Sequence, residues 1–179
     1  MYHDTLVEVQ REVDAFLIPT GVKVTLKTGT QVSVTQALGN SYTLYVNGNL
    51  VRVAGKDGDA LGLVVLEQPD INEMEGPVED KVTAQLKTCF DPEIPVNIVD
   101  LGLIYASDVL PMGKETFHVN ITMTLTAPGC GMGPVLVSEV EEKVKQINGV
   151  VEVKVNLVFD PPWDRNRMSD EAKLQMGLL

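Results

Sequence analysis

Cys130 is the residue of this sequence with the clearest capacity for chemistry. It lies between Gly129 and Gly131, after an alternating apolar segment and shortly before a proline that opens a helix-like stripe. Glycines let the backbone approach a ligand, and the unsatisfied N–H groups at a helix start favour negative charge. A thiolate is therefore easier to form here than on an isolated cysteine, and it would serve as a metal ligand or a nucleophile. The alternative is a buried structural cysteine.

Three carboxylates in the segment Asp91–Tyr105 form the second group of candidates for metal or partner contacts. They are Asp91, Glu93 and Asp100, in a segment that holds two prolines and runs into an apolar stretch. For Asp91 and Asp100 the alternative is structural, because aspartates in turns accept hydrogen bonds from nearby backbone. Glu93 stands between the prolines and has less reason to serve as a turn device.

The remaining polar candidates favour structural roles. Thr126 ends a row of hydroxyls that leads toward Cys130, and such a row is most often a solvated sheet face. His118 lies at the far end of the same segment, which disfavours a thiol hydrolase that uses it as the base. Cys89 closes an apolar stripe and favours core packing. Its spacing from Cys130 is unlike a Cys-x-x-Cys pair and argues against a self-contained zinc site.

The C-terminal segment holds the only tryptophan, Trp163, which follows two prolines. A tryptophan in this setting caps a core or anchors an interface. Ser169 then predicts the start of a short helix. Four apolar residues of this tail would be exposed unless they dock on the domain or on a second subunit: Leu174, Met176, Leu178 and Leu179.

Composition narrows the class of protein. The chain has 179 residues, of which 44% are hydrophobic, and a net charge of −11 with scattered basic residues. This charge argues against a nucleic acid or an anionic membrane as the partner. The start of the sequence has no signal-peptide pattern, and the longest apolar run, Ala60–Leu66, is too short to span a bilayer. We therefore expect a cytoplasmic protein with reduced thiols.

Periodicity predicts an α+β chain with two domains. In the first third, alternating segments flank a turn at residues 27–30 and another at Asn47–Gly48, which is typical of a hairpin with a type I′ turn. The acidic, proline-containing stretch Glu67–Pro77 indicates a boundary. We predict a small all-β domain in residues 1–70 and a compact two-layer α/β domain in residues 71–179.

The second domain has the predicted order helix–strand–strand–helix–strand, with the helices on one face of the sheet. The first helix carries Val78, Val82 and Leu86 and ends near Cys89. Strands are predicted from Val99 to about residue 106 and over residues 117–126. Pro134 opens the second helix, whose buried stripe is Leu136, Val140, Val144 and Ile147. A final strand is predicted where Val151, Val153, Val155 and Leu157 alternate with Glu152, Lys154 and Asn156.

Three sequence blocks carry a family resemblance, and they occur in the order expected of that family. They are Asp91–Tyr105, Thr124–Cys130 and Asp160–Trp163. From about Pro77 onward the chain resembles the iron–sulfur assembly family of SufT, the eukaryotic cytosolic iron–sulfur targeting factors and PaaD. The residues after the cysteine, Gly131–Pro134, are similar to the SufT form, as are the tail and the N-terminal β region.

The resemblance implies a non-enzymatic auxiliary role in iron–sulfur maturation. Cys130 would be the reactive residue or a ligand of a transient cluster or iron, and Asp91 and Glu93 the metal candidates of the acidic loop. No organic cofactor is expected. One thiol cannot hold a cluster, which typically takes four protein ligands, so Cys130 would pair with its copy in a homodimer or with a partner's thiols. The residues expected to shape the loop or contact partners are Asp100, Thr126, Gly129, Gly131 and Trp163.

The expected partners are iron–sulfur carrier or scaffold proteins and client apoproteins. The alternative function is an adaptor that bridges carrier and client while Cys130 is structural. A thiol enzyme is a third reading, and it predicts turnover of model thioesters or peptides.

Overall fold

The computed structural model describes residues 5–91, 94–129 and 131–179. The chain divides into two compact units, Met1–Pro69 and Asp70–Leu179.

The first unit is a six-stranded sheet in which every strand pair is antiparallel, in the order β1-β4-β5-β6-β2-β3. Its elements are β1 (Thr5–Glu8), β2 (Val13–Ile18), β3 (Lys23–Leu26), β4 (Gln31–Leu38), β5 (Ser41–Val46), β6 (Asn49–Ala54) and the 3-10 helix η1 (Gly55–Leu61). The turn at residues 27–30 joins β3 to β4, but these strands do not pair with each other, since β3 pairs with β2.

The hairpin predicted at Asn47–Gly48 is confirmed. β5 and β6 pair directly up to Val46 opposite Asn49. Asn47 has φ 49° and Gly48 has φ 82°, the positive angles that a type I′ turn requires at both central positions. Tyr42 and Leu44 alternate along β5 as fully buried residues of this unit's core.

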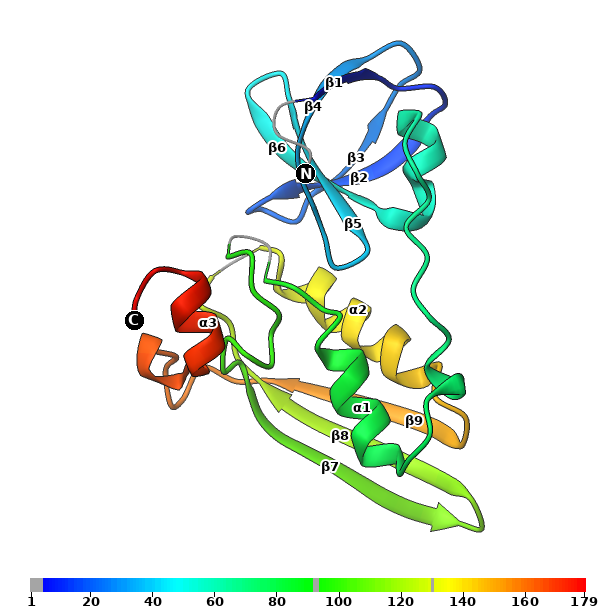
Figure 1. The fold of residues 1–179 in the computed structure, drawn as a ribbon, viewed down its shortest axis with the longest axis vertical. Helices are drawn as coiled ribbons and strands as arrows, with labels where there is room; N and C mark the ends of the chain where they lie inside the picture. Colours follow the sequence, from blue (N-terminus) through cyan, green and yellow to red (C-terminus); the bar gives the residue numbers. More distant parts are fainter. Residues whose placement is uncertain (1–4, 92–93, 130) are drawn as a thin grey trace. The chain divides into compact units, whose positions relative to one another are not determined.

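The second unit has two layers, with α1 and α2 on one face of a three-stranded sheet (Figure 1). Its elements are η2 (Ile71–Glu73), α1 (Val78–Leu86), β7 (Ile104–Gly113), β8 (Thr116–Met123), α2 (Gly133–Lys145), β9 (Val150–Leu157), η3 (Arg165–Arg167) and α3 (Asp170–Gln175). β7 and β8 are antiparallel, and β8 and β9 are parallel through the α2 crossover. The predicted α+β class and the order of elements are confirmed.

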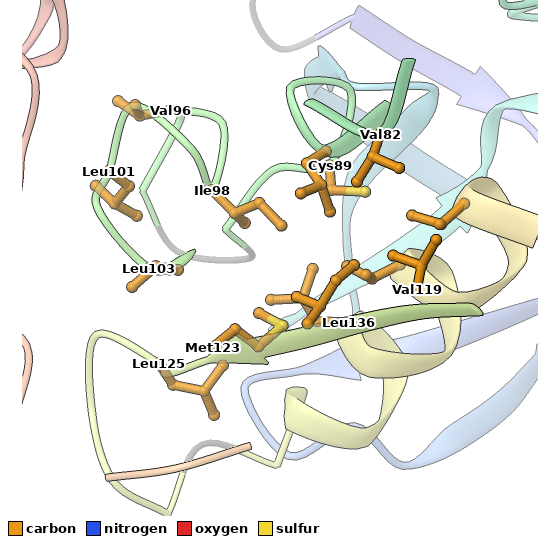
Figure 2. Close-up of a cluster of buried hydrophobic side chains, with 14 of the residues drawn as sticks. Val82, Cys89, Val96, Ile98, Leu101, Leu103, Val119, Met123, Leu125 and Leu136 are labelled. Atoms are coloured by element: carbon orange, nitrogen blue, oxygen red, sulfur yellow. The ribbon is translucent and has the colours of Figure 1, made fainter. Parts of the chain in front are cut away.

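The core of this unit joins residues from α1 through to α3. Cys89 is fully buried, as the stripe of α1 predicted, and lies with residues of the following loop, of β8 and of α2 (Figure 2). The predicted stripe of α2 is buried as well: Leu136, Val140, Val144 and Ile147. Burial of this apolar set, at about 25 cal/mol per Å², is the main driving force for the fold of the unit.

The strand predicted from Val99 begins later, at Ile104. Asn97 Oδ1 accepts the backbone N–H groups of Val99 (3.1 Å) and Asp100 (2.9 Å), which folds the chain into a turn. Gly102 follows with φ 80°, a conformation that a strand does not contain. The apolar residues that suggested a strand are instead buried within this turn.

The predicted final strand is present as β9, with an irregularity at its start. Val151 is 52% exposed although it belongs to the apolar positions of the alternation. The register between β8 and β9 shifts where Phe117 faces Val150 and His118 faces Glu152, so Val151 is left without an opposite residue. This bulge turns its side chain outward, whereas Val153 still packs against the core.

The end of the predicted linker belongs to the second unit. Asn72 Nδ2 donates to Gln146 O (2.9 Å), and Asn72 Oδ1 accepts the N–H of Asn148 (2.8 Å). One side-chain amide therefore satisfies two backbone groups of the turn between α2 and β9. Ile71 adds apolar contact with the core.

Candidate functional site

The loop that follows α1 is anchored at its base by a buried lysine of α2. Lys143 Nζ donates to Thr88 O (2.8 Å) and Thr88 Oγ1 (3.0 Å), while Lys143 O accepts from Gln85 Nε2 (2.6 Å). The Lys143 residue is only 8% exposed, so these contacts satisfy a buried cation and its backbone. They hold the chain directly before Cys89 and the loop that carries Asp91.

Asp91 is buried, with 7% of its surface exposed, and it organises the loop. Its Oδ1 accepts the N–H of Ile94 (2.9 Å), and its own N–H donates to Val96 O (3.2 Å). These two bonds close the neck of the acidic loop. Asp91 thus accepts a backbone hydrogen bond within its own turn, which is the kind of contact that the structural alternative describes.

The second motif meets this loop at Thr126. Thr126 Oγ1 donates to Asp91 Oδ2 over 3.5 Å, across 35 residues of sequence. Gly129 has φ 79°, and among the described residues no atom lies within 4 Å of the position that a Cβ would take. Gly131 lies in the turn directly before α2. Cys130 and Glu93, the other two candidates, lie outside the described residues.

Asp100 is held by its own turn and by the C-terminal segment. Asn97 Nδ2 donates to Asp100 Oδ2 (2.6 Å), and Asp100 O accepts the N–H of Ser169 (2.8 Å). These two contacts tie Asp100 to its own turn and to the C-terminal segment. α3, which Ser169 caps through the N–H of Ala172 (3.1 Å), approaches the acidic loop, where Gln175 Nε2 donates to Pro95 O (3.2 Å).

Trp163 connects the third motif to the first. Its Nε1–H donates to Leu101 O (2.7 Å), and its ring packs against the core of the second unit. This hydrogen bond satisfies a carbonyl of the turn at residues 97–103, so the tryptophan caps that turn.

Thr124 is a candidate that sequence reasoning missed. The alternation of residues 117–126 predicted a solvated face for it, but it is only 1% exposed, and its Oγ1 has no hydrogen-bond partner among the described residues. Buried hydroxyls usually have a hydrogen-bond partner, and this one lies two residues before Thr126 in the sequence. Only the burial reveals it, and no sequence pattern would have done so.

The distribution of metal-binding side chains is limited in the described part of the chain. No group of three or more His, Cys, Asp or Glu residues there is placed to hold a metal ion. His118 lies across β8 from the core and pairs with Glu152 of β9, with Nδ1 and Oε2 3.2 Å apart. Across the described residues, the helices are all too short or too polar to cross a membrane.

A family model matches part of the second unit, and known proteins match more than half of the chain. A family model described as an iron–sulfur cluster assembly protein matches residues 79–155. An Fe-S protein maturation auxiliary factor of Porphyromonas gingivalis is 46% identical over 101 residues, which cover 56% of this chain and 92% of that protein. The factor YitW of Bacillus subtilis, with the same description, is 37% identical over 105 residues, covering 59% and 99% of the two chains.

One solved structure is also similar to this chain. The crystal structure of a domain of unknown function from Bacillus anthracis is 39% identical, covers 57% of this chain and 93% of its own, and has a TM-score of 0.47. The relative from Porphyromonas gingivalis is almost fully accounted for by 101 matched residues, so it has no room for a further unit the size of residues 1–69. With relatives matched over nearly their whole length at such identity, the chain belongs to the iron–sulfur cluster assembly protein family.

Proposed function

We propose that this protein is a non-enzymatic auxiliary factor in the maturation of iron–sulfur proteins, and that Cys130 ligates iron or a cluster in transit. The relatives described as Fe-S protein maturation auxiliary factors support the assignment to iron–sulfur protein maturation. The observation that carries the site is the contact of Thr126 with the buried Asp91 carboxylate, 3.5 Å long. It joins the segments that contain Glu93 and Cys130.

In this proposal Asp91 positions the two loops, and Glu93 ligates the iron. The two oxygens of Asp91 already face the Ile94 N–H and the Thr126 hydroxyl, so this carboxylate holds the two loops together. Glu93 remains the carboxylate candidate for iron. Thr124 adds a buried hydroxyl that could donate to a thiolate or to a cluster sulfur, since hydrogen bonds to sulfur tune such sites.

A cluster bound by this protein is cargo, and one thiol supplies too few ligands for it. Clusters typically take four protein ligands, so the remaining ones come from a second copy or from a carrier or client apoprotein. Either arrangement leaves the cluster exchangeable, as transfer requires. The cytoplasm, where thiols stay reduced, is the compartment that suits this chemistry.

The second candidate function is an adaptor that bridges carrier and client while Cys130 is structural. It is favoured by the exposed apolar residues of the tail, of which Leu174 is 67% and Leu178 is 45% exposed. The tail lies beside the acidic loop through the contact of Gln175 with Pro95. A partner bound there would reach the loop without any metal ligand from this chain.

The deciding experiment measures iron and sulfide, with an absorption spectrum, on anaerobically purified wild type and Cys130→Ser. Cys89→Ala is the matched control, because Cys89 is fully buried in the core. Iron and sulfide in wild type and control but not in Cys130→Ser support the ligand role. If the chain takes up no iron, alone or with a carrier, that role is lost.

Size exclusion after anaerobic reconstitution separates the sources of the missing ligands. A cluster-dependent dimer points to a second copy, and a cluster found only with a carrier points to a partner. Normal client maturation by folded Cys130→Ser would instead favour the adaptor.

A further inference from the structure

A cleft of about 440 Å³ lies where the first motif meets the C-terminal segment. Its lining residues are Gly102, Ile104, Tyr105, Pro161 and Arg167. The site at Asp91 and Thr126 uses none of these side chains, although two of the sequence blocks shared with the family contribute to the cleft. The proposed iron site therefore does not explain this cleft.

The walls of the cleft are fixed by specific contacts. Tyr105 Oη donates to Pro161 O (2.8 Å), which holds the ring against the C-terminal segment. A Cβ on Gly102 would come within 2.3 Å of Arg167 O, so only glycine lets the two backbones approach this closely. Tyr105 and Arg167 are thus set in place before any ligand arrives, which lowers the entropic cost of binding.

Arg167 supplies the binding group. Its guanidinium carbon lies 4.7 Å from the centre of the Tyr105 ring, within the range of a cation–π contact. Its side chain has no hydrogen bond or ion pair with any residue in the described part of the chain, although the protein carries 25 acidic residues against 14 basic ones. A stacked guanidinium keeps its fork of N–H donors directed outward.

We propose that this cleft binds a carboxylate side chain from an acidic segment of a partner protein. The fork of Arg167 matches a carboxylate with two parallel hydrogen bonds. Ile104 and Pro161 provide apolar contact for the methylene groups and backbone of the same segment. A phosphate is disfavoured, because phosphate sites gather several donors, and a net charge of −11 repels a dianion more than a monoanion.

This inference goes beyond the proposed function, and its test requires neither iron nor a client. Nitrogen-15 NMR of the full chain is followed during titration with N-acetyl-glutamate N-methylamide, and separately with the neutral glutamine analogue. Saturable shifts of the Arg167 side-chain Nε–H and of the Gly102 amide are expected with the glutamate probe alone. Equal shifts with both probes, or none with either, overturn the proposal.

Variants assign the effect to the guanidinium. Arg167→Gln is expected to weaken binding of the glutamate probe at least about tenfold, the usual worth of a charged hydrogen-bond pair. Arg165→Gln, which removes an exposed arginine from the same 3-10 helix, is the matched control and leaves binding unchanged. Loss in both variants would mean a general charge effect and contradict the assignment.

A third variant and a third probe keep the test decisive. Arg167→Lys keeps the charge but lacks the planar fork, so binding several-fold weaker than wild type is expected. The comparison of glutamate with glutamine on the wild type stands even if a variant is unstable. Inorganic phosphate that binds tighter than the glutamate probe would overturn the choice of carboxylate.

Discussion

Replacing Gly102 by alanine tests how closely the C-terminal segment packs on the turn after Asn97. Gly102 and Gly129 have nearly the same φ, 80° and 79°. An alanine at either position pays the left-handed strain of about 1–2 kcal/mol. The surroundings differ: the new Cβ at Gly102 would lie 2.3 Å from Arg167 O and 2.7 Å from its carbonyl carbon, whereas no atom of the described part of the chain lies within 4 Å at Gly129.

The excess loss follows from what must move. An ordinary contact is at least 3.4 Å, so the Arg167 backbone would shift by roughly 1 Å. The displaced segment carries the bond from Trp163 Nε1 to Leu101 O (2.7 Å) and the bond from Ser169 N to Asp100 O (2.8 Å). Each contributes about 1 kcal/mol. We therefore expect Gly102→Ala to lower the free energy of unfolding by about 3–4 kcal/mol, against about 1–2 for Gly129→Ala.

Urea unfolding followed by tryptophan fluorescence is the assay, because Trp163 is the only tryptophan and lies in the second unit. The folded Gly102→Ala protein should also show altered Trp163 emission, while Gly129→Ala should not. Equal losses for the two variants would refute the reasoning from close backbone approach and leave only the shared cost of positive φ.

Three further predictions address other parts of the chain. Asn72→Ala removes two hydrogen bonds to the turn between α2 and β9 and should cost about 1–2 kcal/mol by the same urea assay, and an unchanged midpoint would mean that the linker end is not docked. Leu136→Ala empties a core position that is 1% exposed and should cost about 2–5 kcal/mol in thermal unfolding, while Leu174→Ala, 67% exposed, should change stability by less than about 0.5. Arg11→Gln should raise the pKa of Asp59 toward its ordinary value, because the Arg11 hydrogen bond lowers it in the folded protein. Since that pKa is lowered, the stabilising effect is present above the unfolded-state value and is lost as pH falls through the folded one; carboxyl carbon-13 NMR against pH measures it, and an unmoved pKa contradicts it.

The sequence predicted the elements that are determined by residues close to one another in the chain. An Asn-Gly pair accepts positive φ at both central turn positions, so the hairpin at Asn47–Gly48 follows from two residues. The stripe from Leu136 to Ile147 has helical spacing and is buried throughout. The sequence blocks alone also predicted the family, because motif order does not depend on tertiary contacts.

Tertiary structure decided everything that depends on which distant groups meet. The apolar run after Val99 reads as a strand, but the side chain of Asn97 and the positive φ of Gly102 fold it into a turn that Trp163 caps. The contact between Thr126 and Asp91 and the burial of Thr124 come from loops brought together by packing. Residue types show which groups are capable of chemistry, whereas their distances and solvation are set by the whole chain, because burial and pairing are long-range properties.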